Sequence, residues 1–112
     1  MRYRLHFNPE ALKEWNSIDK SLRIQFVRKL ESRLEEPRVQ SSELSGDLRG
    51  LYKVKLATAG YRLVYAVQDL ELVVLVISVG RRDKSEVYRE AAKRKKKTPP
   101  QEWRGPFDGS TT

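Results

Sequence analysis

Five cations and one tyrosine between residues 53 and 88 carry side chains suited to one kind of chemistry. They are Lys53, Lys55, Arg62, Arg81, Arg82 and Tyr88. The planar guanidinium of arginine fits phosphate oxygens, a lysine held among other cations loses its proton more readily than an isolated one, and a tyrosine ring stacks on an unpaired base. RNA supplies its own nucleophile, the 2′-hydroxyl, so these groups would only have to orient it and stabilise the charge developing at phosphorus. The set therefore predicts phosphoryl transfer on RNA.

Other hydrolytic chemistries lack the residues that they need. The chain has no cysteine, and its one histidine, His6, is expected to be a packing or surface residue of the first strand. No group of acidic residues has the character of a metal site, because Asp83 and Glu86 fit the start of a helix better. We therefore predict no catalytic triad, no bound metal and no cofactor.

The elements that would position the cations begin with a hairpin. Residues 52–56 alternate apolar and basic side chains, and residues 61–67 run back as a strand rich in aromatic and β-branched residues. A turn over residues 57–60 places Lys55 opposite Arg62, whereas a three-residue loop would shift the register by one. Like charges across a strand pair are destabilising. A local conflict without visible compensation is expected at a functional site.

The remaining elements complete a sheet with helices. Residues 72–79 are apolar almost throughout, which is typical of a central strand buried on both faces, and residues 1–7 alternate as a further strand. Two amphipathic helices follow that strand, the first capped by Asn8 and the second begun by Asp19, and a third helix would start at Asp83. The predicted fold is α/β (α+β), with a small, mostly antiparallel four-stranded sheet, two N-terminal helices packed on one face and a C-terminal helix, in the order β-α-α-β-β-β-α.

The face of the sheet that carries the cations is predicted to be the functional one. Both N-terminal helices have one apolar side and should pack on the core face of the sheet. The opposite face, with Lys53, Lys55 and Arg62, is then left for a ligand. Trp15, Tyr61 and Tyr65 are assigned to packing.

Charge supports a polyanionic partner. The 112-residue chain has a net charge of +8, and residues 81–97 hold nine Lys or Arg against three Asp or Glu. A basic stripe beside a cationic sheet face is expected of a nucleic-acid binder, although many such stripes only keep a surface solvated. The absence of cysteine fits a reducing compartment. The longest apolar run, residues 72–77, is too short for a membrane span, so we expect a cytoplasmic protein without a membrane partner.

The two ends of the chain differ in pattern. Residues 1–95 have the periodicity of one folded domain, whereas residues 96–112 form a basic, proline-containing segment without periodicity. We expect this segment to be a flexible tail. Trp103 and Phe107 in the tail would then be incidental aromatics, unless they anchor a partner.

In sequence the chain resembles the RelE family of bacterial toxin–antitoxin systems, over about residues 3–93. The matching segments are residues 11–15 (ALKEW), 52–56 (YKVKL), 60–65 (GYRLVY), 76–82 (VISVGRR) and 85–88 (SEVY). The resemblance implies a small toxin that enters the ribosomal A site and cuts mRNA there without a metal, leaving a 2′,3′-cyclic phosphate. It places the catalytic positions on Lys53, Lys55, Arg62, Arg82 and Tyr88.

Roles and partners follow from the same resemblance. It implies base and charge-stabilising roles for Lys53 and Lys55, phosphate binding for Arg62, contact with the leaving group for Arg82 and placement of the nucleotide for Tyr88. Further RNA contacts are expected at Arg81, Lys84, Arg89, Lys93 and Arg94. The implied partners are a cognate antitoxin, the 30S A site with its rRNA, and mRNA, with operator DNA bound only through the antitoxin complex. The alternatives are a ParE-like inhibitor of DNA gyrase and a non-catalytic basic RNA-binding protein.

Overall fold

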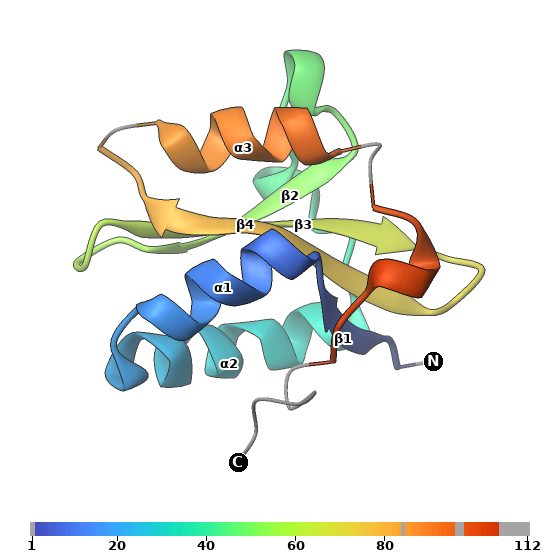
Figure 1. Cartoon of the computed structure of the whole chain (residues 1–112), viewed down its shortest axis with the longest axis horizontal. Coiled ribbons are helices and arrows are strands. Elements are labelled where there is room, and N and C mark those ends of the chain that lie inside the picture. The colour runs from blue at the N-terminus through green and yellow to red at the C-terminus, as the bar shows by residue number, and fades with distance from the viewer. Residues whose placement is uncertain (1, 84, 96–97, 106–112) are drawn as a thin grey trace.

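A four-stranded sheet lies between helices in a computed structural model that describes residues 2–83, 85–95 and 98–105 (Figure 1). The main elements are β1 (Arg4–Phe7), α1 (Pro9–Ser17), α2 (Lys20–Glu35), β2 (Leu51–Leu56), β3 (Tyr61–Gln68), β4 (Val73–Arg81) and α3 (Glu86–Arg94). The strand order is β1-β4-β3-β2, with β1 parallel to β4 and the other pairs antiparallel. This confirms the predicted fold class and element order. Across the described residues no helix has the length and apolar character needed to cross a membrane.

The strand β4 is central, as predicted, and it contains an irregularity. Seven of its residues, numbers 73–79, are buried. Val64 pairs with Ser78 and Tyr65 pairs with Val76, which leaves Ile77 as an extra residue in β4. Such a bulge turns successive side chains toward the same face. Ile77 therefore packs toward α3, and the adjacent Ser78 hydroxyl donates to the Val87 carbonyl oxygen of α3 at 2.7 Å.

Two apolar clusters cover the two faces of the sheet. The helices α1 and α2 pack on one face, where Phe7, Trp15, Phe26 and Tyr65 lie in the larger cluster. The helix α3 packs on the other face, against Ile77 and neighbouring apolar residues. The face predicted to be open is therefore partly covered, because the apolar residues that β3 and β4 present there must also be shielded from water.

Of the two predicted helix caps, Asn8 caps α1, whereas Asp19 stands at the start of α2 without a side-chain cap hydrogen bond. The Asn8 side chain accepts hydrogen bonds from the backbone N–H groups of Glu10 at 2.8 Å and Ala11 at 3.1 Å, as expected of a helix cap. The strand β1 begins at Arg4 and not at residue 1. Its only neighbour in the sheet is β4, and Arg4 already lies opposite Val73, the first residue of that strand.

The start of α3 differs from the prediction. Asp83 does not cap the helix, because α3 begins at Glu86 and the residue before it is Ser85, which has a φ angle of +57°. Asp83 instead faces Arg81, with 3.5 Å between Oδ1 and Nε. The chain therefore passes through the left-handed Ser85 before α3 begins, and Asp83 has its partner, Arg81, outside the helix.

The C-terminal segment contains structure that its composition did not predict. Over residues 98–104 the chain forms a short 3-10 helix, Pro100–Glu102, and an antiparallel bridge between Arg104 and Phe7. Trp103 packs against the cluster under α3, and its indole lies 6.2 Å from the His6 ring. Backbone groups of this stretch bond to Phe7 at the outer edge of β1, and the predicted flexibility of the tail stays a prediction. The domain boundary at residue 95 stays a prediction, and Phe107 lies outside the described residues.

Candidate active site

A row of residues across three strands forms the floor of the candidate site. Lys55 pairs with Arg62 in the β2–β3 hairpin, and Arg62 pairs with Gly80 of β4. The predicted like-charge pair is therefore present. In the adjacent row Lys53 pairs with Val64. Because alternate residues of a strand share a face, Lys53, Lys55 and Arg62 lie on the side of the sheet that carries α3.

Arg62 is the buried cation of this row. The residue is only 6% exposed, and its Nη1 atom donates to the Tyr61 carbonyl oxygen at 3.0 Å. In the described part of the chain no carboxylate forms an ion pair with it. A buried charge without a counter-charge is costly, so the position of Arg62 favours an anion as its partner.

Arg82 directly follows the end of β4, and Tyr88 lies in the helix that packs on the face carrying the row. The backbone N–H of Arg82 donates to the Gly60 carbonyl oxygen at 2.8 Å, which ties the end of β4 to the turn of the hairpin. Gly60 has a φ angle of +73°, a conformation that glycine adopts without strain. The Arg82 side chain is exposed. Tyr88, on the first turn of α3, is half-buried against the cluster on the face that carries Arg62.

Arg81 points away from this group. Its guanidinium carbon lies 5.8 Å from the centre of the Tyr61 ring, and Tyr61 packs against the cluster on the opposite face of the sheet. The hydrogen bond with Asp83 raises the pKa of Arg81. The structure therefore places Arg81 on the side of the sheet opposite to the row of cations.

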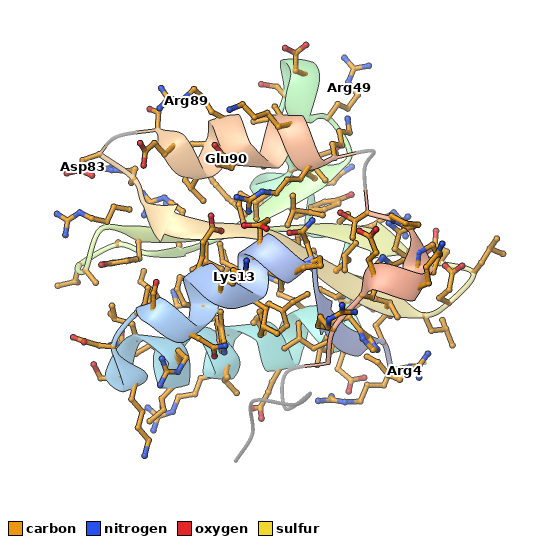
Figure 2. All side chains as sticks on the ribbon, in the orientation of Figure 1. Arg4, Lys13, Arg49, Asp83, Arg89 and Glu90 are labelled. Atoms are coloured by element: carbon orange, nitrogen blue, oxygen red, sulfur yellow. The ribbon has the colours of Figure 1, made fainter. Side chains whose placement is uncertain are left out.

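The other predicted RNA contacts divide between exposed and engaged side chains. Arg89 lies on the outer side of α3, exposed and 3.8 Å from Glu86 (Figure 2), and Lys93 is exposed and 3.5 Å from Glu90. Lys84 lies outside the described residues. Arg94 is half-buried, and its guanidinium is taken up by protein groups.

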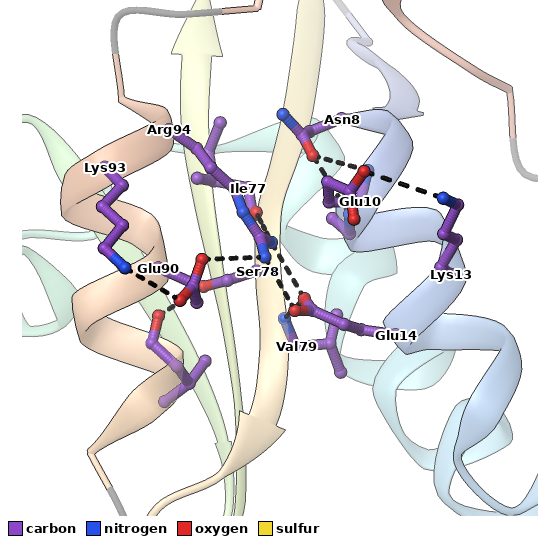
Figure 3. Close-up of polar contacts among 12 residues, drawn as sticks. Asn8, Glu10, Lys13, Glu14, Ile77, Ser78, Val79, Glu90, Lys93 and Arg94 are labelled. Carbon is purple, nitrogen blue, oxygen red and sulfur yellow. Dashed lines mark hydrogen bonds and ion pairs between the residues drawn. The ribbon is translucent and has the colours of Figure 1, made fainter.

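Arg94 lies between α3 and α1, beside the part of β4 that extends past β1 (Figure 3). Its two terminal nitrogens donate to the two carboxylate oxygens of Glu14 at 3.0 and 2.9 Å, to Glu90 at 3.2 Å and to the Ile77 carbonyl oxygen at 2.9 Å. Glu14 also accepts from the Val79 N–H at 3.0 Å. Burial alone lowers the pKa of Arg94, but Glu14 and Glu90 outweigh that effect and raise it. This side chain joins α3 to α1, which leaves little of it for phosphate.

A basic recess beside Lys53 and Lys55 was not foreseen in the sequence. It encloses about 340 Å³ and is lined by these two lysines with Lys29, Arg33, Ser41 and Ser42. Lys29 and Arg33 are four residues apart and so share one side of α2. That spacing was visible in the sequence, but the contact of α2 with the edge of β2 was not.

Acidic residues offer no metal site in the part of the chain that the structure describes. No three His, Cys, Asp or Glu side chains there are grouped so that they could hold an ion. The side chains predicted for the site are lysines, arginines and a tyrosine.

Comparison with known proteins identifies the family. A model described as "ParE toxin of type II toxin-antitoxin system, parDE" matches residues 5–86. The mRNA interferase toxin RelE of Escherichia coli K12 is 50% identical over 94 residues, which span 84% of this chain and 98% of that protein. The chain is a RelE-type member of the ParE toxin family. A putative RelE-like toxin protein of Escherichia coli is 43% identical over the same shares of the two chains.

Solved RelE structures share the fold. The free E. coli RelE toxin, determined as a double arginine mutant, has 49% identity and a TM-score of 0.76, over 84% of this chain and 98% of that one. The RelE chain of the intact E. coli RelBE toxin–antitoxin complex has 47% identity and a TM-score of 0.67, over 70% of this chain and 95% of that one. The predicted RelE resemblance is confirmed, including the architecture that positions the cations.

Proposed function

We propose that this toxin is an endoribonuclease that cuts mRNA in the A site of the ribosome. The attacking 2′-oxygen forms a bond to the adjacent phosphorus while the bond to the 5′-oxygen breaks. The products are a 2′,3′-cyclic phosphate and a 5′-hydroxyl. One proton leaves the 2′-hydroxyl and one arrives at the 5′-oxygen, so the step needs a base, an acid and cations around the phosphate, but no added water.

The observation that carries this proposal is the buried guanidinium of Arg62, which lies opposite Lys55 and has no carboxylate partner in the described part of the chain. A scissile phosphate beside this pair would receive the planar fork of Arg62 and the ammonium of Lys55. Lys53, on the same side of β2, would share the proton transfer from the 2′-hydroxyl. The exposed Arg82 would reach the leaving 5′-oxygen, and Tyr88 would stack on a base next to the cut.

The experiment is primer extension on mRNA held in programmed ribosomes. Purified toxin should give cuts between codon positions in the A site, and the same mRNA without ribosomes should remain intact. Intact mRNA combined with stalled DNA replication would instead favour gyrase inhibition. Binding to ribosomes without any cut would favour a non-catalytic basic protein.

An antitoxin is the second part of the proposal, because RelE relatives are known in complex with RelB-type partners. A groove on α2 offers a suitable surface, since it exposes Ile24 and Val27, 44% and 42% exposed, among Lys20, Arg23 and Arg28. An amphipathic acidic segment would match both the apolar and the cationic side chains. Operator DNA would be bound only through such a complex, and the toxin would act in the cytoplasm, where ribosomes are.

A further inference from the structure

The recess between α2 and the edge of β2 has the makings of a second phosphate site. It is lined by Lys29, Arg33, Ser41, Ser42, Lys53 and Lys55, and it encloses about 340 Å³. Four of these six side chains are cations, two carry hydroxyl groups, and none is acidic or apolar. We propose that this recess binds a backbone phosphate of RNA other than the scissile one, an inference that rests on the proposed nuclease function.

Arg33 gives the recess a preformed donor. Its Nη1 atom donates to the Lys53 carbonyl oxygen at 3.1 Å and to the Tyr65 hydroxyl at 3.0 Å, and its Nη2 atom donates to the Ser42 hydroxyl at 3.1 Å. The side chain is therefore held in place before any ligand arrives. A fixed donor loses less conformational entropy on binding than a free one.

The partners that hold Arg33 do not neutralise it. A carbonyl oxygen and a serine hydroxyl are uncharged. Burial raises the pKa of Tyr65, against the smaller opposite effect of Arg33, so the phenol keeps its proton and donates it to the Pro37 carbonyl oxygen at 2.6 Å. The positive charge of Arg33 therefore remains available to an anion.

The lysines of the recess are equally unmatched. Within residues 2–83, 85–95 and 98–105 no carboxylate lies within ion-pair distance of Lys29, Lys53 or Lys55. Elsewhere on the surface, Lys13 and Lys93 each face a glutamate on their own helix. The recess thus concentrates cations where the described residues supply no counter-charge, and a phosphate would supply it.

The recess is continuous with the proposed catalytic row. The strand β2 is an outer strand of the sheet, next to β3. Residues 43–44 bridge its first residues, Leu51 and Tyr52, whereas Lys53 and Lys55 belong both to the recess and to the β2–β3 pairing that holds Arg62. An RNA strand that presents one phosphate to Arg62 can pass over this edge and present a neighbouring phosphate to Arg33 and Lys29. The row and the recess would thus form one continuous positively charged surface for a single strand of RNA.

An acidic peptide would not suit the recess as well. The groove on the opposite side of α2 mixes cations with Trp15, Ile24 and Val27, as an amphipathic helix requires. The recess has no apolar lining residue, and serine hydroxyls with a planar guanidinium match phosphate oxygens. The two surfaces of α2 therefore favour different partners.

The test compares Lys29→Gln with Arg28→Gln. Each variant removes one exposed positive charge from α2, but Arg28 lies in the groove and Lys29 in the recess. Binding of a short single-stranded 2′-O-methyl RNA, which cannot be cut, is measured across salt concentrations. Lys29→Gln should lower the slope of log K against log salt by about 0.7 and Arg28→Gln should leave it unchanged. Equal slopes for the two variants would overturn the proposal.

Two ribosome arms identify the source of the phosphate. If it belongs to mRNA, Lys29→Gln weakens binding to programmed ribosomes and not to ribosomes free of mRNA. If it belongs to ribosomal RNA, both affinities fall by the same factor. Unchanged ribosome binding with weaker binding of an acidic antitoxin peptide would assign the recess to that peptide and refute the phosphate site.

The outcomes separate this inference from the proposed nuclease. A parent protein that cuts mRNA, with Lys29→Gln indistinguishable from Arg28→Gln, refutes the recess and keeps the nuclease. A parent that cuts nothing, with the salt slope still lowered by Lys29→Gln alone, refutes the nuclease and keeps the phosphate site.

Discussion

The two outer edges of the sheet differ in whether their cations have carboxylate partners. Where β4 extends past β1, Arg94 and Glu14 form a two-point ion pair that also satisfies the Ile77 carbonyl and the Val79 N–H. At the β2 edge, by contrast, the cations have no carboxylate partner among the described residues. An arginine whose charge is neutralised by a carboxylate of the same chain stabilises the fold. A cation left unmatched, at a cost in stability, is the better candidate for ligand binding.

The largest effect on cleavage should come from the two neighbouring arginines 81 and 82. They show the same contrast, because Arg81 is paired with a carboxylate and Arg82 has no such pair in the described part of the chain. Arg82→Ala should lower the rate of mRNA cleavage on programmed ribosomes roughly a hundredfold or more, because it removes a cation expected to stabilise charge in the transition state. Arg81→Ala should have a much smaller effect, since Arg81 is paired with Asp83 on the other side of the sheet.

The same assay extends to Lys55→Ala, which should also lose most of the cleavage activity while the far-ultraviolet circular dichroism spectrum is unchanged. Lys55 is exposed, so its truncation leaves no cavity. Parental rates for both Arg82→Ala and Lys55→Ala would show that the site assignment is wrong.

Breaking the ion pair at the β4 edge should mainly affect stability. Glu14→Gln leaves Arg94, whose side chain is 13% exposed, without its principal counter-charge, and Glu14 itself is 31% exposed. Removing one partner of a fully buried pair costs about 3–5 kcal/mol, so we expect roughly 1–3 kcal/mol here. The melting temperature should fall by roughly 5–15 °C.

The matched control for this prediction is Glu86→Gln. Glu86 forms an exposed pair with Arg89 on the same helix, and such pairs contribute about 0–1 kcal/mol. Thermal unfolding followed by circular dichroism should therefore separate the two variants. Equal melting temperatures would mean that the Arg94 contacts hold nothing together. At temperatures where Glu14→Gln is folded, its cleavage rate should remain near that of the parent.

A smaller loss of stability is expected from the C-terminal segment. Trp103→Ala removes an indole that packs against the cluster under α3 and donates to the Thr98 carbonyl oxygen at 3.1 Å. Because Trp103 is only half-buried, the free energy of unfolding should fall by roughly 1–2 kcal/mol, below the values for fully buried aromatics. Urea unfolding measures this change. A variant as stable as the parent would indicate that the segment does not remain docked in solution.

Local patterns were enough to predict the hairpin and the site row. The alternation in β2 and the turn before Tyr61 fixed which residues face each other, so the opposition of Lys55 and Arg62 was predicted from sequence and is confirmed in the structure. The buried run of β4 likewise indicated a central strand. In each case the determining contacts are close in sequence or follow from strand periodicity.

Features that depend on distant contacts were missed. The Ile77 bulge depends on how β3 and β4 align, the docking of Trp103 depends on a chain return to β1, and the recess depends on α2 meeting the β2 edge through Arg33 and Lys53. Asp83 fitted a capping pattern, but the left-handed turn at Ser85 displaced the helix start. Composition and spacing carry no information about such pairings.

The smallest predicted effect concerns an exposed carboxylate that is neutralised as fully as the one at the β4 edge. Asp69 accepts hydrogen bonds from both terminal nitrogens of Arg38, at 2.8 and 2.7 Å, and from the Tyr3 hydroxyl at 2.8 Å. The bonds from Arg38, followed by that from Tyr3, hold the pKa of Asp69 below its ordinary value. A carboxyl whose pKa is lower in the folded than in the unfolded state stabilises the fold above its unfolded pKa of about 3.9. This contribution is lost as the pH falls through the folded pKa.

Asp69→Asn should therefore be slightly less stable than the parent near neutral pH, and the difference should disappear as the pH falls below about 4. Urea midpoints for parent and variant across this range measure the effect. Glu71→Gln is the control, because Glu71 is a nearby exposed acid whose carboxylate has no ion pair in the described part of the chain. A difference for Asp69→Asn that stays constant with pH would mean that Asp69 acts through shape and not through charge. In that case an ion pair in the structure would not by itself show that a cation is structural. The free energy of each ion pair would have to be measured before cations could be divided into structural and functional ones.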